Sequence, residues 1–174
     1  CYTSPRLCSF RERIRVAGSP LAHDRLVGFA GELRDVSESC GLSFFEVATV
    51  LGLYAFERED VEVAVIEVGL GGRLDATNVI CPEITAITNV ALDHSDYLGN
   101  SLSEIAREKL GIVKPGVPLI TTESDEDLLE IFCEVTKDVG VPCLKANEPE
   151  PDRIDVNPDR TRFTLETNAW GQIE

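Results

Sequence analysis

Two largely apolar runs, each ending in polar or glycine-rich sequence, dominate the pattern of this chain. They cover residues 63–68 and 84–90. Apolar runs of this length are typical of strands buried on both faces, as in a parallel sheet. Two shorter runs, 117–121 and 141–145, each follow a turn that contains glycine. We therefore expect four strands in one mainly parallel sheet.

Apolar residues at helical spacing lie between these runs and ahead of them. The spacing predicts helices over residues 21–38, 44–58 and 127–139, and a short helix that starts at Ser101. Ser43 and Ser101 each stand three residues before a glutamate, which is the capping-box pattern of a helix start. Residues 11–16 alternate charged and apolar side chains, which predicts a half-exposed strand.

The alternation of strands and helices predicts an α/β fold, with a mainly parallel sheet flanked by helices. From Glu148 the composition changes to prolines and acids, and a turn-bounded strand follows over 162–167. We expect residues 1–147 to form one domain and residues 148–174 a small antiparallel β appendage of it. A chain of 174 residues, 43% hydrophobic, can build one such core.

The charge of the chain narrows the classes of partner. Sixteen basic and 31 acidic residues give a formal net charge of −15, which disfavours a nucleic-acid surface. Only four of the basic residues are lysines. Strong negative charge with few lysines favours a protein that works in concentrated salt, because salt screens self-repulsion. An ordinary acidic cytosolic protein is the alternative.

Other absences place the chain among cytoplasmic proteins. No apolar run reaches the roughly 18 residues that span a bilayer, so we expect no membrane partner. The six cysteines are scattered without a C-x-x-C pair, which favours free thiols over a zinc site or a disulfide framework. The chain starts at Cys1 and contains no methionine, so we expect it to be a piece of a longer polypeptide.

Chemically capable side chains follow the two central runs. Glu67 and Val68 end the first run, and Asp93 and His94 come just after the second. In open α/β sheets ligands gather at the carboxyl ends of strands. Together with Lys109, these residues offer oxygen ligands for a hard cation, an imidazole and a cation for phosphate. The alternative is that each is an ordinary solvated or hydrogen-bonded side chain.

The segment Gly69-Leu70-Gly71-Gly72 raises the possibility of a dinucleotide-binding module. The G-x-G-x-x-G fingerprint needs a third glycine at position 74, which is Leu74, and a helix directly afterwards. A loop composition follows instead, which argues against this reading. The chain also contains no G-x-x-x-x-G-K-[ST] phosphate loop.

Longer motifs point to a family. The segments EVGLGGRLDATN and LDHSDYLGNSLSEIAREKLGIVKPG, together with YTSPRLCSFRERIRV and LSFFE, closely resemble the folylpolyglutamate synthase and dihydrofolate synthase family, within the Mur ligase superfamily. The resemblance runs from residue 2 to about residue 121. It implies the central domain of an ATP-dependent acid–amino-acid ligase of the EC 6.3.2 class. Such an enzyme phosphorylates a carboxylate of a pteroate or folate, and L-glutamate then attacks the acyl phosphate.

The resemblance also implies roles for individual residues. Ser4 and Glu67 would hold one Mg²⁺, and His94 a second. Lys109 matches a lysine that is carbamylated in the family and assists the second metal, so we expect His94 and Lys109 to be catalytic. Residues at the positions that contact the pterin are Phe45, Asp75 and Ala76.

The chain departs from the family in ways that affect these expectations. Arg6 stands where the family commonly has a histidine. The family's phosphate loop lies upstream of the matched segments and its C-terminal domain lies downstream, so we expect the chain alone to be inactive. The alternative function is a Mur-type ligase, whose substrate would be a cell-wall precursor.

Overall fold

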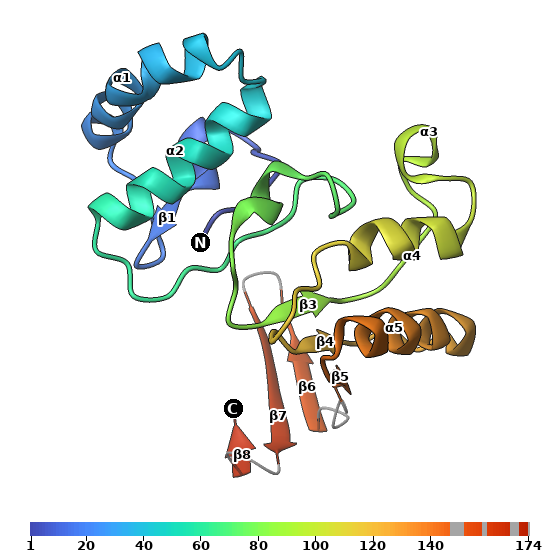
Figure 1. Ribbon diagram of the computed structural model, residues 1–174. Coiled ribbons are helices and arrows are strands. Elements are labelled where there is room, and N and C mark those ends of the chain that lie inside the picture. Colours follow the sequence, from blue (N-terminus) through green and yellow to red (C-terminus); the bar gives the residue numbers. More distant parts are fainter. Residues whose placement is uncertain (147–151, 158–159, 168–170, 174) are drawn as a thin grey trace.

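The computed structural model describes residues 1–146, 152–157, 160–167 and 171–173, which form three groups of elements (Figure 1). The first group contains helices α1 (His23–Ser39) and α2 (Phe44–Arg58). The second contains strands β3 (Thr85–Ile87), β4 (Leu119–Thr121) and β5 (Cys143–Lys145) with helices α4 (Leu102–Leu110) and α5 (Glu126–Val139). The third contains strands β6 (Asp152–Val156), β7 (Thr161–Thr167) and β8 (Gly171–Ile173).

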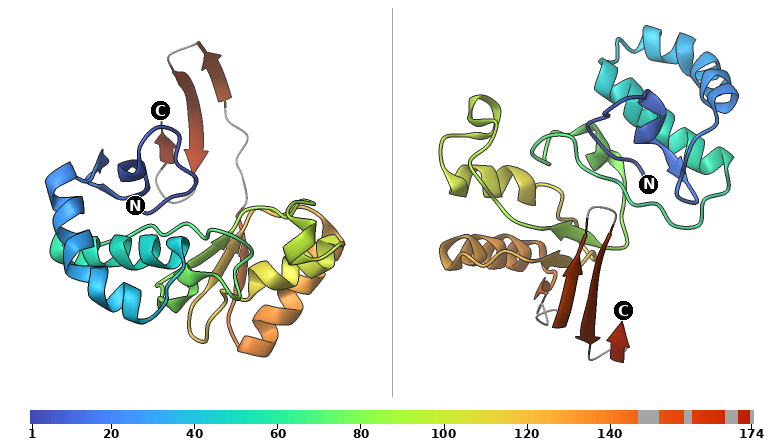
Figure 2. Two further views of the ribbon diagram at one scale, coloured as in Figure 1. Left: turned by 90° about the horizontal axis from the view of Figure 1, so that it is seen from above. Right: turned by 180° about the vertical axis from the view of Figure 1, so that it is seen from behind.

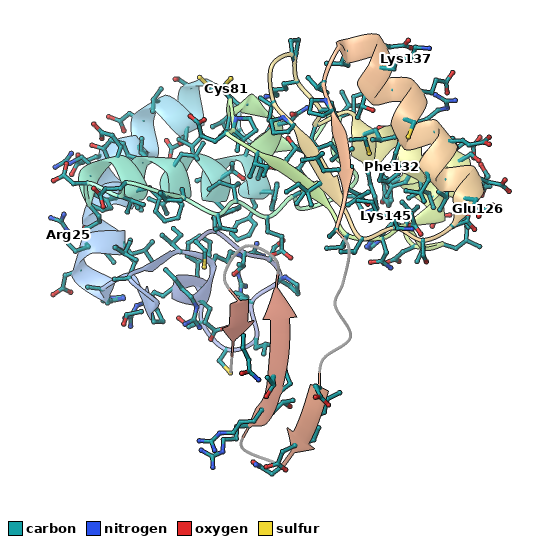
Figure 3. The ribbon with its side chains drawn as sticks, turned by 90° about the horizontal axis from the view of Figure 1, so that it is seen from below. Arg25, Cys81, Glu126, Phe132, Lys137 and Lys145 are labelled. Carbon is teal, nitrogen blue, oxygen red and sulfur yellow. The ribbon has the colours of Figure 1, made fainter. Side chains whose placement is uncertain are left out.

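Strands β3, β4 and β5 form a parallel sheet in that order, as the alternating pattern predicts. Helices α4 and α5 connect successive strands and pack against each other. Phe132 of α5 and Leu119 of β4 are both 0% exposed. Figure 3 shows Phe132 pointing from α5 towards the sheet while Lys137 points to solvent. This core anchors the strand ends that carry the candidate site.

Helices α1 and α2 form a second core with the N-terminal segment. Tyr2 and Ile14 are buried there with Phe29 of α1 and Ala55 of α2. Helix α2 starts at the predicted capping box, because the Ser43 hydroxyl accepts from the Glu46 N–H at 3.4 Å and the Glu46 carboxylate accepts from the Ser43 N–H at 2.7 Å.

The expected strand over residues 63–68 is an extended segment with a single β-bridge, between Tyr2 and Ile66. The Tyr2 N–H donates to the Val65 carbonyl at 2.8 Å, and the Glu67 N–H donates to the Tyr2 carbonyl at 2.9 Å. Val63 and Val65 remain exposed. A strand requires a ladder of backbone partners, and among the described residues only Tyr2 bridges to this segment.

The expected strand over residues 11–16 is also replaced, by the 3₁₀ helix η1 (Phe10–Arg13) and two short strands, β1 (Arg15–Val16) and β2 (Ser19–Pro20). The cause is Glu12. Its carboxylate accepts from the backbone N–H groups of Leu7, Cys8 and Ser9, which curls the chain into a turn. The alternation of charged and apolar residues does not reveal that a side chain will bond these backbone N–H groups and favour a turn over a strand.

The C-terminal strands pair antiparallel, β6 with β7 and β7 with β8, so the described part of the appendage has the predicted type of sheet. It extends away from the helices (Figure 2). The proposed boundary at 147/148 lies outside the described residues. All six cysteines are free thiols. Within the described ranges, no helix combines the length and the apolar character that a membrane span requires.

Candidate active site

The entry segment of the chain brings Ser4 to Glu67. The Tyr2 ring is 1% exposed, and its hydroxyl hydrogen-bonds the hydroxyl of Thr49 in α2 at 3.2 Å. With Tyr2 fixed against the 63–68 segment, the Ser4 N–H donates to Glu67 Oε2 at 2.6 Å. The structure thus joins two of the three predicted metal ligands, which are 63 positions apart in sequence.

A glycine-rich loop follows Glu67 and is closed by Asp75. Asp75 Oδ2 accepts from the N–H groups of Gly69 and Leu70, at 3.1 and 2.9 Å. Its other carboxylate oxygen accepts from the Thr77 N–H at 2.9 Å, at the start of the 3₁₀ helix η2 (Ala76–Val79). Asp75 therefore organises the loop, in addition to lining a pocket.

That pocket contains all three predicted substrate-binding residues: Phe45, Asp75 and Ala76. Tyr97 and Leu74, both largely exposed, also line it. The Phe45 ring packs directly on Gly69, where an added Cβ would lie 2.3 Å from Phe45 Cζ. The pocket therefore offers an aromatic wall fixed against the loop backbone, beside a carboxylate, and both features suit a planar ligand with polar edges.

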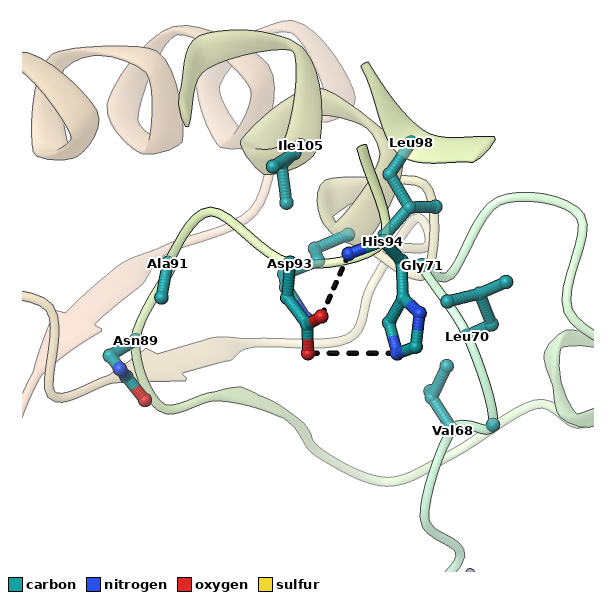
Figure 4. A pocket seen from close by; sticks show the side chains of 11 residues that line it. Val68, Leu70, Gly71, Asn89, Ala91, Asp93, His94, Leu98 and Ile105 are labelled. Carbon is teal, nitrogen blue, oxygen red and sulfur yellow. Dashed lines mark hydrogen bonds and ion pairs between the residues drawn. The ribbon is translucent and has the colours of Figure 1, made fainter. Parts of the chain in front are cut away.

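A second pocket holds His94, Asp93 and Lys109 (Figure 4). The His94 N–H donates to Asp93 Oδ1 at 2.8 Å, and His94 Nε2 lies 3.6 Å from Asp93 Oδ2. His94 has a φ of 52°, an uncommon left-handed conformation for a non-glycine residue. Costly backbone conformations of this kind cluster at functional sites.

The glycine-rich loop forms one wall of the His94 pocket, since Val68 and Gly69, the two residues after Glu67, line it. Glu67 directly precedes this wall, but neither Glu67 nor Ser4 lines the pocket, so the contacts described here join Ser4 to Glu67 and not to His94. Leu70 and Leu98 line both pockets, so the two pockets are neighbours.

The loop is clasped to the C-terminal end of α4, which carries Lys109. The Arg73 N–H donates to the Glu108 carbonyl at 2.9 Å, and the Asn78 side-chain amide donates to the Gly111 carbonyl at 3.0 Å. The approach is so close that a Cβ on Gly72 would lie 2.7 Å from the Lys109 carbonyl oxygen. These bonds satisfy carbonyls that a helix end leaves unpaired, and they fix the position of Lys109 relative to the loop.

The donors present suit Mg²⁺ bound sparsely by protein. The described residues contain no group of three or more His, Cys, Asp or Glu side chains that could hold a metal ion. Mg²⁺ commonly takes one or two carboxylates and completes its shell with water and substrate phosphates. Glu67, which accepts the Ser4 N–H, and His94, which lines the pocket that begins at Val68, form a sparse donor set of that kind.

Sequence reasoning missed Asn89, which also lines the His94 pocket. The only available signal was its place at the end of the second apolar run. It also missed Tyr97, because helix α3 (Ser95–Leu98) is a single turn with no periodic pattern.

Fold and pockets together define a class. Residues 32–173 match the family model of the Mur ligase middle domain. The chain belongs to the Mur ligase family.

Its relatives narrow the class further. The chain is 36% identical over 177 residues to the "Probable bifunctional folylpolyglutamate synthase/dihydropteroate synthase" of Haloferax volcanii, covering 97% of this chain and 21% of that protein. It is 38% identical over 124 residues to the dihydrofolate synthase/folylpolyglutamate synthase of Escherichia coli, covering 71% of this chain and 29% of that protein. The chain thus spans 21% and 29% of the lengths of these two relatives.

Solved structures agree with this placement. The apo form of L. casei FPGS matches 98% of this chain with a TM-score of 0.85 and 33% identity, over 43% of that structure. E. coli FolC in complex with DHPP and ADP matches 99% of this chain with a TM-score of 0.80 and 32% identity, over 40% of that structure. An FPGS–AMPPCP–folate complex gives a TM-score of 0.86 at 32% identity, covering 98% of this chain and 43% of that one.

Proposed function

We propose that this chain is part of an ATP-dependent ligase that adds L-glutamate to a pteroate or folate through an acyl phosphate. The observation that carries the proposal is the contact between two chemically different pockets. One is walled by Phe45 and Asp75, the other holds His94 and Lys109, and Leu70 and Leu98 line both. A substrate whose heterocycle binds in the first pocket could extend its carboxylate towards a metal and phosphate in the second pocket.

The relatives support the substrate class. Their names assign folylpolyglutamate and dihydrofolate synthesis, and solved neighbours hold an ATP analogue with folate, or DHPP with ADP. The dinucleotide alternative lacks its key element, because the glycine-rich loop leads into the four-residue 3₁₀ helix η2 and not into an α-helix.

In this proposal Ser4, Glu67 and His94 would hold Mg²⁺, which would stabilise charge that develops on the transferred phosphoryl group. Glu67 keeps one oxygen free of the Ser4 N–H, because that bond uses Oε2. Phe45, Asp75 and Ala76 would bind the pterin. Lys109, held by the clasp between the loop and α4, would face the same reaction space as His94.

The nucleotide's phosphate loop would come from outside this stretch, because the sequence contains no G-x-x-x-x-G-K-[ST] motif. The chain by itself is then expected to form no amide bond.

The test is a substrate panel on the complete protein. ADP release is measured with dihydropteroate, with mono- and polyglutamylated folates, and with a UDP-linked cell-wall precursor, each with and without L-glutamate. We expect turnover with a folate-type acceptor only when L-glutamate is present. Turnover with the cell-wall precursor and with no folate-type acceptor would contradict the proposed substrate class. Turnover by residues 1–174 without the rest of the protein would refute the proposal that the phosphate loop comes from outside this stretch.

A further inference from the structure

Glu123 is a buried carboxylate that the proposed chemistry does not use. It lies two residues after β4 and is only 5% exposed. Its carboxylate accepts three backbone N–H groups: Val90 at 2.8 Å on Oε2, and Ser124 at 2.8 Å and Asp125 at 3.0 Å on Oε1. A buried charge is costly unless such bonds satisfy it, so its retention calls for an explanation.

The bond to Val90 lies where the backbone ladder between β3 and β4 has ended. The last ladder pair joins Ile87 and Thr121. Beyond it, the Thr122 hydroxyl donates to the Thr88 carbonyl at 2.9 Å, and Glu123 accepts from the Val90 N–H. Two side chains from the residues just after β4, Thr122 and Glu123, thus bond the backbone of Thr88 and Val90 beyond the last ladder pair.

This anchoring has a direct consequence for the pocket. Val90 is buried in the same core cluster as Ile87, whereas its two neighbours in sequence, Asn89 and Ala91, line the His94 pocket. His94 follows four residues after Val90 with its φ of 52°. On its downstream side, the His94 carbonyl accepts from the N–H groups of Tyr97 and Leu98, at 2.9 and 3.1 Å. The Glu123 bond is the matching anchor upstream.

We propose that Glu123 is a positioning residue for this site: its carboxylate fixes the Val90 end of the segment that carries Asn89, Asp93 and His94 into the pocket. It acts through the backbone and touches neither substrate nor metal. That the His94 pocket is a reaction site rests on the proposed function. That Glu123 anchors Val90 rests on the hydrogen bonds alone.

The variant Glu123→Gln tests the anchoring with almost no change in shape. A glutamine can keep one carbonyl oxygen for the Ser124 and Asp125 N–H groups, but its NH₂ then faces the Val90 N–H, and two donors cannot pair. We expect hydrogen exchange at the Val90 and His94 amides to be about tenfold faster or more, because their local opening becomes easier. The Thr85 and Leu119 amides, which lie in the sheet, should change only with global stability.

Two further variants keep the test decisive. Thr122→Val removes only the neighbouring bond to Thr88, so it should give a smaller increase at the same amides even if Glu123→Gln folds poorly. Asp125→Ala is the matched control: it removes the cap that Asp125 Oδ1 provides to the Leu128 N–H at 3.1 Å, and it leaves the Val90 bond in place. It should destabilise α5 without selective exchange at Val90 or His94. Equal acceleration at all amides in Glu123→Gln, or none at Val90, would overturn the proposal.

Mn²⁺ provides a second readout, as a paramagnetic substitute for Mg²⁺. We expect Mn²⁺ to broaden the His94 ring proton signals of the unmodified chain and of Asp125→Ala. Glu123→Gln should need about tenfold more Mn²⁺ for the same broadening, as is typical when a group that orients a metal ligand is lost. Absence of broadening in every protein would count against the metal assignment, while the exchange data would still decide the role of Glu123. If Glu123→Gln reached the same broadening at the same Mn²⁺ concentration as the unmodified chain, the result would contradict the positioning role of Glu123.

Discussion

Lys109 is the residue whose role depends most on its surroundings. It lies in the last turn of α4 and lines the same pocket as His94. An ammonium group next to Mg²⁺ would be repelled, whereas reaction of the neutral amine with CO₂ gives a carbamate, whose anionic oxygens can support a metal. From the family resemblance, we propose that Lys109 carries this carbamate in the complete enzyme.

We predict that Lys109→Ala in the complete protein lowers the ligase rate by roughly 100-fold, the upper end of the range for loss of a group that supports a metal. Added acetate or another short carboxylate should restore part of that rate. Arg107→Ala is the control, since Arg107 is on the same helix but pairs with Glu134 at 2.7 Å. Steady-state rates with and without the carboxylate decide the matter. A Lys109→Ala enzyme with full activity would eliminate the role.

Glu123 also predicts a pH effect on stability. Burial alone would raise the pKa of Glu123, but hydrogen bonds from the Asp125, Val90 and Ser124 N–H groups, with the charge of Lys145, outweigh it and lower that pKa. A carboxylate with a lowered folded-state pKa stabilises the fold above the unfolded value of about 4.3. The contribution is lost as the pH falls through the folded-state pKa.

Glu123→Gln should therefore lower the free energy of unfolding by about 2 kcal/mol at pH 7, the typical cost of an unpaired buried donor. The difference from the unmodified chain should shrink as the pH falls below about 4.3, because the Glu123 carboxylate of the unfolded chain then takes up a proton before that of the folded chain, whose pKa is lower. Urea unfolding at pH 7, 5 and 3.5 measures it. A difference independent of pH would contradict the explanation.

At the scale of elements, the contact between the glycine-rich loop and α2 gives a prediction with an internal control. Gly69→Ala must displace the Phe45 ring, because an added Cβ would lie 2.3 Å from it. We expect a loss of about 1–3 kcal/mol in the free energy of unfolding, the range for overpacking. Gly28→Ala, within α1 and with nothing within 4 Å of the added Cβ, should gain about 0.5–1 kcal/mol. Chemical denaturation that gives both variants the same sign would contradict the packing described.

Helices and the parallel strands were predictable because their signals are local. Helix α2 occupies Phe44–Arg58, the predicted 44–58, and α5 begins one residue before the predicted start at 127. The failures involve competition or missing partners. The turn at Glu12 depends on one side chain bonding three backbone groups, and the 63–68 segment has one β-bridge, to Tyr2, among the described residues.

Part of the grouping of residues in the pockets could be anticipated from the sequence. Strand ends and motifs brought Glu67, His94 and Lys109 to attention, and the structure places the last two in one pocket. Glu123 could not be found in this way. Its bond to Val90 joins residues 33 positions apart, and no local pattern marks a glutamate whose partner lies on another strand.

At the scale of the whole molecule, the net charge of −15 predicts a response to salt. Self-repulsion should be screened strongly as the Debye length falls from about 10 Å at 0.1 M to about 3 Å at 1 M. The exposed arginine–carboxylate pairs, such as Arg107–Glu134, contribute little that salt could weaken. We therefore predict that the Tm rises by several degrees, roughly the effect of 1 kcal/mol, between 0.1 and 2 M KCl. Thermal unfolding with a Tm that falls over this range would contradict a fold limited by its charge.

The central claim of the proposed function is that the substrate's carboxylate is activated by phosphorylation. The direct test uses the complete protein, ATP, L-glutamate and dihydropteroate or folate labelled with ¹⁸O in the carboxylate, with mass analysis of the released phosphate. An acyl phosphate passes one carboxylate oxygen to phosphate when the amine displaces it, so each inorganic phosphate should carry one ¹⁸O. Unlabelled phosphate accompanying amide formation, or label recovered in AMP, would contradict the account.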